Sequence, residues 1–277
     1  MSVVEVSGLR KAYGGVVAVD GVELDVAAGE VFALLGPNGA GKSTTVEILE
    51  GHRKRDGGVV RVLGQDPGKP SGDWRARIGI VLQATADAAE LTVREAVSHF
   101  AGYYPNPRDP DAVIDLVGLT EKAGARAGKL SGGQRRRLDV ALGIVGRPEL
   151  LFLDEPTTGF DPEARRRFWT LIRMLADEGT TILLTTHYLD EAEALADRVA
   201  VIARGRIVAE GAPTTLGGRA TAEATVRWRG ADGPQVRTTA EPAKLIAELY
   251  RHGEPAELTV SRPTLEDVYL DLIGEHP

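Results

Sequence analysis

The sequence predicts an α/β protein with a parallel sheet at its centre. Continuous apolar runs of strand length occur at Val31–Leu35 and Leu150–Leu153. Such runs are typical of strands that are buried on both faces, as in parallel sheets. A glycine-rich stretch joins the first of these runs to a helical segment, Ser43–Glu50. A strand, a glycine-rich turn and a helix in succession form the start of an α/β unit.

The first thirty residues contain short apolar segments separated by turn signals. We expect strands at Val3–Val6, Val16–Val19 and Val22–Val26, with turns at Gly14-Gly15 and Asp20-Gly21. A β region therefore precedes the glycine-rich loop.

The middle of the chain combines helical segments with further buried strands. Apolar residues at helical spacing predict mainly helix from about residue 88 to residue 146. A second helix begins at Asp161-Pro162, an N-cap followed by a first-turn proline, and ends at Gly179. Buried strands are expected at Leu150–Leu153, Thr181–Thr185 and Ala200–Ile202.

The composition changes near Pro213, which predicts two domains, residues 1–212 and residues 213–277. We interpret the second as a small C-terminal α+β appendage with loose segments at 217–218 and 230–234. Its expected elements are strands at 224–228 and 258–261, a helix at 243–250 and a final helix opening at Thr264 with capping-box spacing to Asp267.

Composition excludes several classes of protein. Of 277 residues, 43% are hydrophobic and 26% are charged, which is ordinary for a globular chain and excludes disordered or fibrous classes. The net charge of -7 argues against a basic nucleic-acid binder, so no nucleic-acid partner is expected. The chain has no cysteine, which excludes disulfides and thiolate metal sites. No signal peptide is evident, and no run approaches the ~20 apolar residues that span a bilayer.

The glycine-rich stretch fits the phosphate-loop pattern of glycine, four residues and Gly-Lys-Ser. Glycines let backbone N–H groups surround phosphate oxygens, and the following helix N-terminus adds positive potential. Lys42 can reach the β and γ phosphates, and Ser43 can ligate Mg²⁺. The alternative is a glycine-rich turn with a chance Lys-Ser pair, which the flanking strand and helix disfavour. The expected nucleotide-binding residues here are Gly36, Pro37, Asn38, Gly39, Ala40, Gly41, Lys42, Ser43 and Thr44.

Three further polar side chains are expected at the same edge of the sheet. Asp154 and Glu155 follow one buried strand and His187 follows another. Ligands of open α/β sheets bind at the carboxyl ends of the strands. Asp154 can then hold Mg²⁺, Glu155 can polarise an attacking water, and His187 can hydrogen-bond a γ-phosphate. An acidic pair alone would be interpreted as solvated, and the neighbouring phosphate loop argues against that interpretation. A lone histidine is more often structural, so His187 by itself is a weak signal.

A second motif gives the chain a family likeness. The run Leu130, Ser131, Gly132, Gly133, Gln134 resembles the signature sequence of ATP-binding cassette (ABC) ATPases, and it stands shortly before the strand that ends in Asp154. Together with the phosphate loop it is a specific match, covering roughly residues 1–212. The resemblance implies a P-loop NTPase core with an N-terminal antiparallel β subdomain and a helical subdomain, and it implies ATP and Mg²⁺ as cofactors.

The resemblance also assigns roles to single positions. Tyr13 matches the aromatic residue that stacks on adenine, although a packed tyrosine in a strand turn is the alternative. Gln83 matches the glutamine that joins the core to the helical region and senses Mg²⁺ and water. Glu155 matches the catalytic base and His187 the switch histidine. Asp161 matches the aspartate of a dimer-contact loop, and it can also cap its helix. Phe160 stands where the family usually has leucine. Because both residues are apolar, this difference is expected to affect only the packing at the dimer seam.

The signature residues imply a dimer. The N–H groups of Ser131, Gly132 and Gly133 open a helix and form a second anion site. In the family, two cassettes associate head to tail, and the phosphate loop of one and the signature of the other enclose each ATP. The resemblance therefore implies a homodimer that closes around ATP and opens after hydrolysis.

The end of the chain bears on the work that ATP hydrolysis drives. The stretch Arg262–Tyr269 resembles the ending of subunits in the drug, antibiotic and polysaccharide export branch. This implies an exporter ATPase on the cytoplasmic face of the membrane, working with a separate transmembrane permease that docks near 83–97. Two alternatives are a soluble ABC-type ATPase acting on DNA or ribosomes and a nucleotide-dependent regulator. The absence of a long coiled coil and the intact Glu155 disfavour them.

Several conspicuous residues have ordinary interpretations. The arginine runs 135–137 and 165–167 are expected to be solvated helix faces. Trp74 and Trp228 are expected to be packing residues. The histidines at 52, 99, 252 and 276 lack metal-ligand spacing.

Overall fold

The computed structural model describes residues 1–81, 89–230, 233–251 and 253–274. Its centre is a six-stranded sheet in the order β5-β6-β7-β3-β8-β9, in which the first five strands are parallel and β9 is antiparallel to β8. This confirms the predicted α/β class. The strands are β3 (Val31–Leu35), β5 (Ile78–Val81), β6 (Leu150–Asp154), β7 (Thr181–Thr186), β8 (Arg198–Ala203) and β9 (Arg206–Gly211).

A second, antiparallel sheet in the order β2-β1-β4 is formed by β1 (Ser2–Tyr13), β2 (Val16–Ala27) and β4 (Gly57–Val62). The prediction of a turn at Asp20-Gly21 is wrong, because β2 runs through it. The pairing steps from Leu9 with Val22 to Arg10 with Asp20, which leaves Gly21 as an extra residue at a φ of 72°. Glycine reaches that φ without strain, so the chain forms a β-bulge and the strand continues.

The two faces of the central sheet pack into different hydrophobic cores. Along β3, Phe32 and Leu34 face the antiparallel sheet and α1 (Lys42–Leu49), whereas Val31, Ala33 and Leu35 face the helical region that follows β5 and the helices after β6 and β7. Both faces are thus covered, which is why the strand is apolar at every position. Trp74, in α2 (Gly72–Ala76), belongs to the first core, and its indole N–H donates to the carbonyl of Val62 at 2.8 Å. This confirms its packing role.

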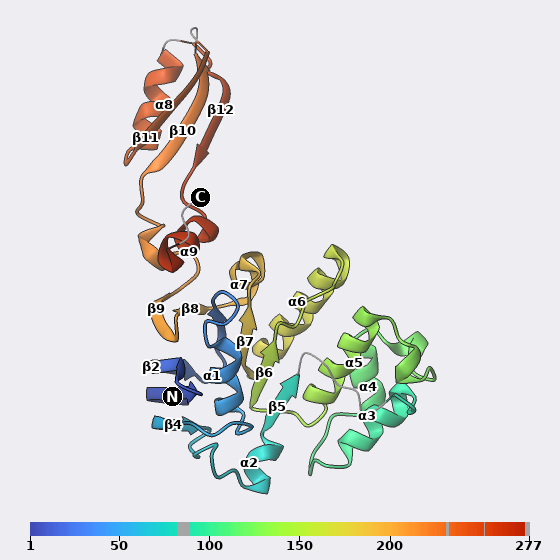
Figure 1. Cartoon of the computed structure of the whole chain (residues 1–277). Helices are drawn as coiled ribbons and strands as arrows, with labels where there is room; N and C mark the ends of the chain where they lie inside the picture. The colour runs from blue at the N-terminus through green and yellow to red at the C-terminus, as the bar shows by residue number, and fades with distance from the viewer. Residues whose placement is uncertain (82–88, 231–232, 252, 275–277) are drawn as a thin grey trace.

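Residues 89–146 form a helical region beside β5 (Figure 1), as predicted. Short polar caps start its helices. Thr92 forms a capping box with Glu95, and Asp109 accepts hydrogen bonds from the N–H groups of Asp111 and Ala112. The elements are α3 (Val93–Ala101), α4 (Pro110–Leu116), the 3₁₀ turns η1 (Thr120–Lys122) and η2 (Ala127–Lys129), and α5 (Gly132–Ile144).

Two more helices flank the sheet, α6 (Pro162–Asp177) and α7 (Leu189–Leu195). The first begins at Asp161 and Pro162, as predicted, and buries Phe168, Leu171, Ile172 and Leu175.

The chain beyond residue 212 divides in space (Figure 1). A three-stranded antiparallel sheet in the order β11-β10-β12, with α8 beside β10, stands apart from the central sheet. The final helix, α9 (Leu265–Ile273), returns and contacts α7, β8 and η3 (Leu216–Gly218), with Leu265 and Val268 buried in the same core as the helical region. The remaining elements are β10 (Ala224–Gly230), β11 (Gly233–Thr239), α8 (Pro242–Arg251) and β12 (Ala256–Ser261). In the segment 230–234, which was expected to be loose, Gly230 belongs to β10 and residues 233–234 belong to β11.

Candidate nucleotide site

The glycine-rich loop runs from the end of β3 into α1, at the carboxyl edge of the central sheet. Its last glycine, Gly41, is the N-cap of α1 at a φ of 106°. A Cβ at this position would collide with the carbonyl oxygen of Ala18 in β2. Only glycine therefore allows the loop to lie this close to the antiparallel sheet while presenting a helix N-terminus.

Lys42 reaches back over this loop. Its Nζ donates to the carbonyl oxygens of Gly36, at 2.7 Å, and Pro37, at 3.2 Å. Only 6% of the residue is exposed. Burial lowers the pKa of Lys42, and the carboxylates of Glu155 and Asp154 oppose that shift. The lysine and both acids, far apart in sequence, therefore share one local electrostatic environment.

Asp154 stands at the carboxyl end of β6, next to β7. The hydroxyl of Thr185 in β7 donates to Oδ1 of Asp154, which fixes one carboxylate oxygen and leaves the other for a ligand. Ser43, in the first turn of α1, is exposed. A hydroxyl and a half-buried carboxylate suit Mg²⁺, which takes few protein ligands and completes its shell with waters and phosphate oxygens. No cluster of three or more His, Cys, Asp or Glu that could hold a metal occurs within the described residues.

Glu155 and His187 lie within contact distance. Oε1 of Glu155 is 3.1 Å from Nδ1 of His187. The backbone N–H of Glu155 donates to the carbonyl and hydroxyl oxygens of Thr185, at 3.1 and 3.2 Å. The register of β6 and β7 pairs Asp154 with Thr185, so the ends of both strands present their polar residues side by side.

Tyr13 ends β1 and is 38% exposed. Nζ of Lys11 and the guanidinium of Arg53 each lie 5.3 Å from the centre of its ring. An exposed aromatic face flanked by two cations is a surface on which a nucleotide base can stack.

The signature residues open α5. Ser131 is the N-cap, its hydroxyl accepts a hydrogen bond from the N–H of Gln134, and the Gln134 side chain accepts one from the N–H of Ser131. Ser131 and Gly132 are exposed, whereas Leu130 is buried. The first turn of a thirteen-residue helix is thus presented to solvent, where its amide groups attract anions.

Asp161 caps α6, and its Oδ1 accepts the N–H of Ala164 at 2.8 Å. Phe160 is buried and meets Phe168 edge to face, with ring centres 5.8 Å apart. Phe160, which stands where the family usually has leucine, therefore packs in the core of the cassette. Gln83 lies outside the described residues.

The arginine run of α5 is not a solvated face, and that prediction is wrong for Arg136. This residue is 7% exposed and donates to the carbonyl oxygens of Asp154 and Pro156. Arg135 and Arg137 are half-buried and donate to the carbonyls of Ala127 and Gly118. A run of three arginines in a helix carries no sequence signal that distinguishes the buried one.

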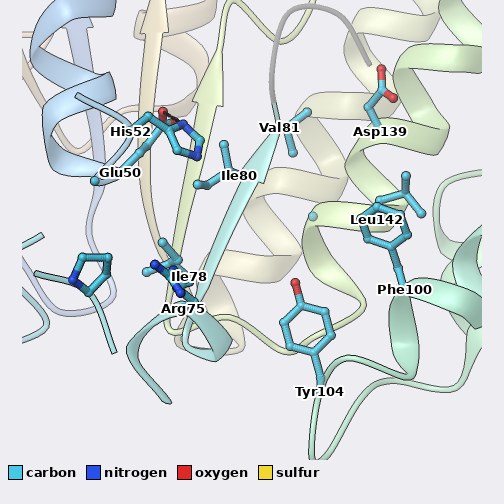
Figure 2. Close-up of a pocket in the computed structure, with 13 residues that line it drawn as sticks. Glu50, His52, Arg75, Ile78, Ile80, Val81, Phe100, Tyr104, Asp139 and Leu142 are labelled. Atoms are coloured by element: carbon cyan, nitrogen blue, oxygen red, sulfur yellow. Dashed lines mark ion pairs between the residues drawn. The ribbon is translucent and has the colours of Figure 1, made fainter. Parts of the chain in front are cut away.

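A cleft of about 300 Å³ is lined by residues of the core and of the helical region. Figure 2 shows Glu50 and His52 on one side of β5 and Phe100 and Leu142 on the other. Glu50 is 5% exposed, and Nδ1 of His52 lies 3.3 Å from its Oε2. Burial, with help from the charges of Asp154 and Glu47, raises the pKa of Glu50 to about 8.

Comparisons with known proteins agree with this geometry. The ABC transporter family model matches residues 19–158. The daunorubicin/doxorubicin resistance ATP-binding protein of Streptomyces peucetius is 40% identical, over 99% of this chain and 93% of that protein. The Nod factor export ATP-binding protein I of Rhizobium sp. (strain N33) is 44% identical, over 77% of this chain and 72% of that protein.

Solved structures give the same fold. An ATP-binding subunit of an ABC transporter superposes with a TM-score of 0.74 at 22% identity, covering 98% of this chain and 99% of that one. An ATP-binding cassette in its ADP conformation gives a TM-score of 0.67 at 26% identity, over 76% of this chain and 91% of that one. Within the described residues, no helix is both long and apolar enough to cross a bilayer.

Proposed function

The chain belongs to the ABC transporter family and is an ATP-hydrolysing cassette of it; on this premise we propose that it powers export of a drug, antibiotic or other amphipathic or polymeric substrate. The substrate would cross the membrane through a separate transmembrane permease, and the cassette would act on the cytoplasmic face. Two relatives support the direction and substrate class, since they are named for drug resistance and for Nod factor export.

In the proposed catalytic site, each ATP lies between two copies of the chain. The glycine loop and Lys42 of one copy hold its phosphates, Tyr13 stacks on the adenine, and the first turn of α5 from the other copy closes the site. Asp161 lies in the loop that would meet the other copy. Closure excludes water and strengthens the electrostatic contacts with the phosphates.

Hydrolysis in this site needs a polarised water and charge stabilisation at the γ-phosphate. The proposed base is Glu155, oriented by His187 at 3.1 Å, and this contact is the observation that carries the assignment. The positive charge of Lys42 offsets the charge that builds up on the phosphate oxygens. Ser43 and Asp154, with Gln83, would hold Mg²⁺, which neutralises phosphate charge when bound.

The assignment of the base is tested by replacing Glu155 with Gln. The amide keeps the shape of the side chain but cannot accept a proton, so ATP still binds while turnover falls by a factor of about 100 or more, the range of general-base contributions. Binding is measured by equilibrium titration, turnover by phosphate release, and dimer formation by sedimentation with ATP. Glu149→Gln is the matched control, because Glu149 pairs with Arg77 on the surface. Turnover in E155Q equal to that in E149Q would remove Glu155 from this role.

Coupling to export is tested separately. Reconstituted with its permease in vesicles, the wild-type cassette should show ATP turnover that rises with an amphipathic substrate. E155Q should abolish substrate movement while leaving the complex assembled. Movement of substrate in E155Q vesicles would argue against ATP-driven export.

A further inference from the structure

Arg136 joins the signature helix to the backbone around Glu155. It lies on α5 in the second turn after the Ser131 cap, and its side chain reaches the segment that follows β6. Nη2 donates to the carbonyl oxygen of Asp154 at 2.6 Å, and Nε donates to that of Pro156 at 3.1 Å. The fixed fork of the guanidinium thus spans the two carbonyls on either side of Glu155.

Glu155 needs such support, because its backbone is in the left-handed region with a φ of 45°. A residue with a Cβ is strained in this conformation, which persists only when neighbouring contacts impose it. Thr185 holds the N–H of Glu155 from the β7 side. Arg136 holds the neighbouring carbonyls from the α5 side, so both sides of the residue are fixed.

The backbone conformation decides where the carboxylate points. With Glu155 held in this way, its Oε1 comes to 3.1 Å from Nδ1 of His187. A more extended backbone at Glu155 would turn the side chain away from the edge of the sheet. The carboxylate's direction therefore depends on α5 staying in register with β6.

We propose that Arg136 is a positioning residue: it sets the backbone of Glu155 from the signature helix and so makes the proposed base of one ATP site move with the helix that contacts the other ATP. This inference rests on the proposed function, in which the first turn of α5 touches the nucleotide held by the second copy. The link from that nucleotide to Glu155 is short, because Ser131 and Arg136 belong to the same rigid helix.

The competing explanation is that Arg136 only fills the space between α5 and β6. Burial lowers the pKa of Arg136, and the carboxylates of Asp139 and Asp154 oppose that shift. A buried charge of this kind is costly unless its hydrogen bonds are made. A purely structural arginine would stabilise the fold without a particular effect on the chemical step, so the two explanations differ in what a substitution does to kcat.

The test compares Arg136→Gln and Arg136→Lys with Arg137→Gln. Arg137 is the next residue of α5, half-buried, and also donates to a carbonyl, that of Gly118. We expect R136Q to lower kcat at least tenfold while the Kd for ATP, by equilibrium titration, changes less than twofold. R136K, which keeps the charge but cannot span both carbonyls, should fall between R136Q and wild type. R137Q should resemble wild type, and thermal melting of all three variants reports folding.

Cooperativity tests the link between the sites. The wild-type rate should rise with ATP concentration with a Hill coefficient above 1, and R136Q should bring it toward 1 while R137Q keeps it. A kcat for R136Q within twofold of R137Q, or a loss matched in ATP affinity and melting temperature, overturns the positioning role. An unchanged Hill coefficient in R136Q overturns the link. Neither result depends on E155Q, whose retained turnover would instead overturn the base assignment.

Discussion

Glu50 gives a prediction whose sign and size follow from its environment. The residue ends α1 inside the cleft, where burial and the nearby charges of Asp154 and Glu47 raise its pKa to about 8 from the ordinary 4.5. In the folded protein at neutral pH the carboxyl group therefore keeps its proton. Its Oε2 lies 3.3 Å from Nδ1 of His52.

The raised pKa makes the free energy of unfolding depend on pH. Below pH 4.5 Glu50 is protonated in both states and has no pH-linked effect. Between pH 4.5 and 8 the unfolded chain has lost the proton and the folded chain keeps it, so stability falls as pH rises, by about 1.4 kcal/mol per pH unit. Over the whole window the loss approaches roughly 5 kcal/mol. Glu50→Gln has the same shape and cannot ionise, so it removes this loss.

The assay is urea unfolding of wild type and E50Q at pH 5, 6, 7 and 8. Tryptophan fluorescence is a suitable signal, because Trp74 packs in the same core as the neighbouring α1. We expect the two proteins to be close in stability at pH 5, and E50Q to be more stable by about 4 kcal/mol at pH 8. Glu149→Gln is a control of opposite sign: its carboxylate pairs with Arg77, which lowers the pKa of Glu149, so this variant should lose stability above pH 4.5 and match wild type in acid. A stability gap between E50Q and wild type that does not change with pH would refute the reasoning.

Two further substitutions separate nucleotide binding from packing. Tyr13→Ala should raise KM for ATP roughly tenfold with kcat nearly unchanged, because stacking on a base contributes about 1–3 kcal/mol; Tyr13→Trp should retain affinity, and equal KM values for both variants would exclude stacking. Leu265→Ala should lower the free energy of unfolding by about 2–5 kcal/mol, because Leu265 is 1% exposed in the core, and should speed proteolysis at the C-terminal end. Tyr250→Ala, on the exposed side of α8, should do neither.

The parallel strands were predictable from sequence because burial on both faces leaves an uninterrupted apolar run. β3, β6 before Asp154 and β8 after Arg198 follow this rule. β7 is buried throughout but is apolar only at Ile182–Leu184. β5 does not, since it has only four residues and one of them is glycine. Gly79 of β5 lies against the carbonyl oxygen of Gly143, so a side chain is excluded and the apolar pattern is interrupted there. β9 alternates and β11 exposes most of its residues, as edge strands do, so neither contains an apolar run.

The parts of the candidate nucleotide site, and their meeting at one edge of the sheet, were predictable from sequence. The glycine loop is a local motif, and sheet order explains the rest: β6, β7 and β3 are neighbours, so residues at their carboxyl ends must meet. Arg136 was not predictable, because the carbonyls it holds are 18 and 20 residues away. Backbone carbonyls carry no residue identity, so no sequence pattern marks them as partners.

The C-terminal segment shows why composition alone does not divide a chain in space. β10, β11 and β12 form their own sheet, yet α9 lies in the core of the nucleotide-binding part. The reason is local packing. Gly217 has a φ of 61°, and a Cβ there would collide with Val268 of α9, so a glycine that looked like a flexible linker instead allows close approach. A glycine in the sequence can therefore indicate either a flexible linker or a position packed tightly against a helix. Only the structure, which shows the side chain packed against the glycine, distinguishes these two cases.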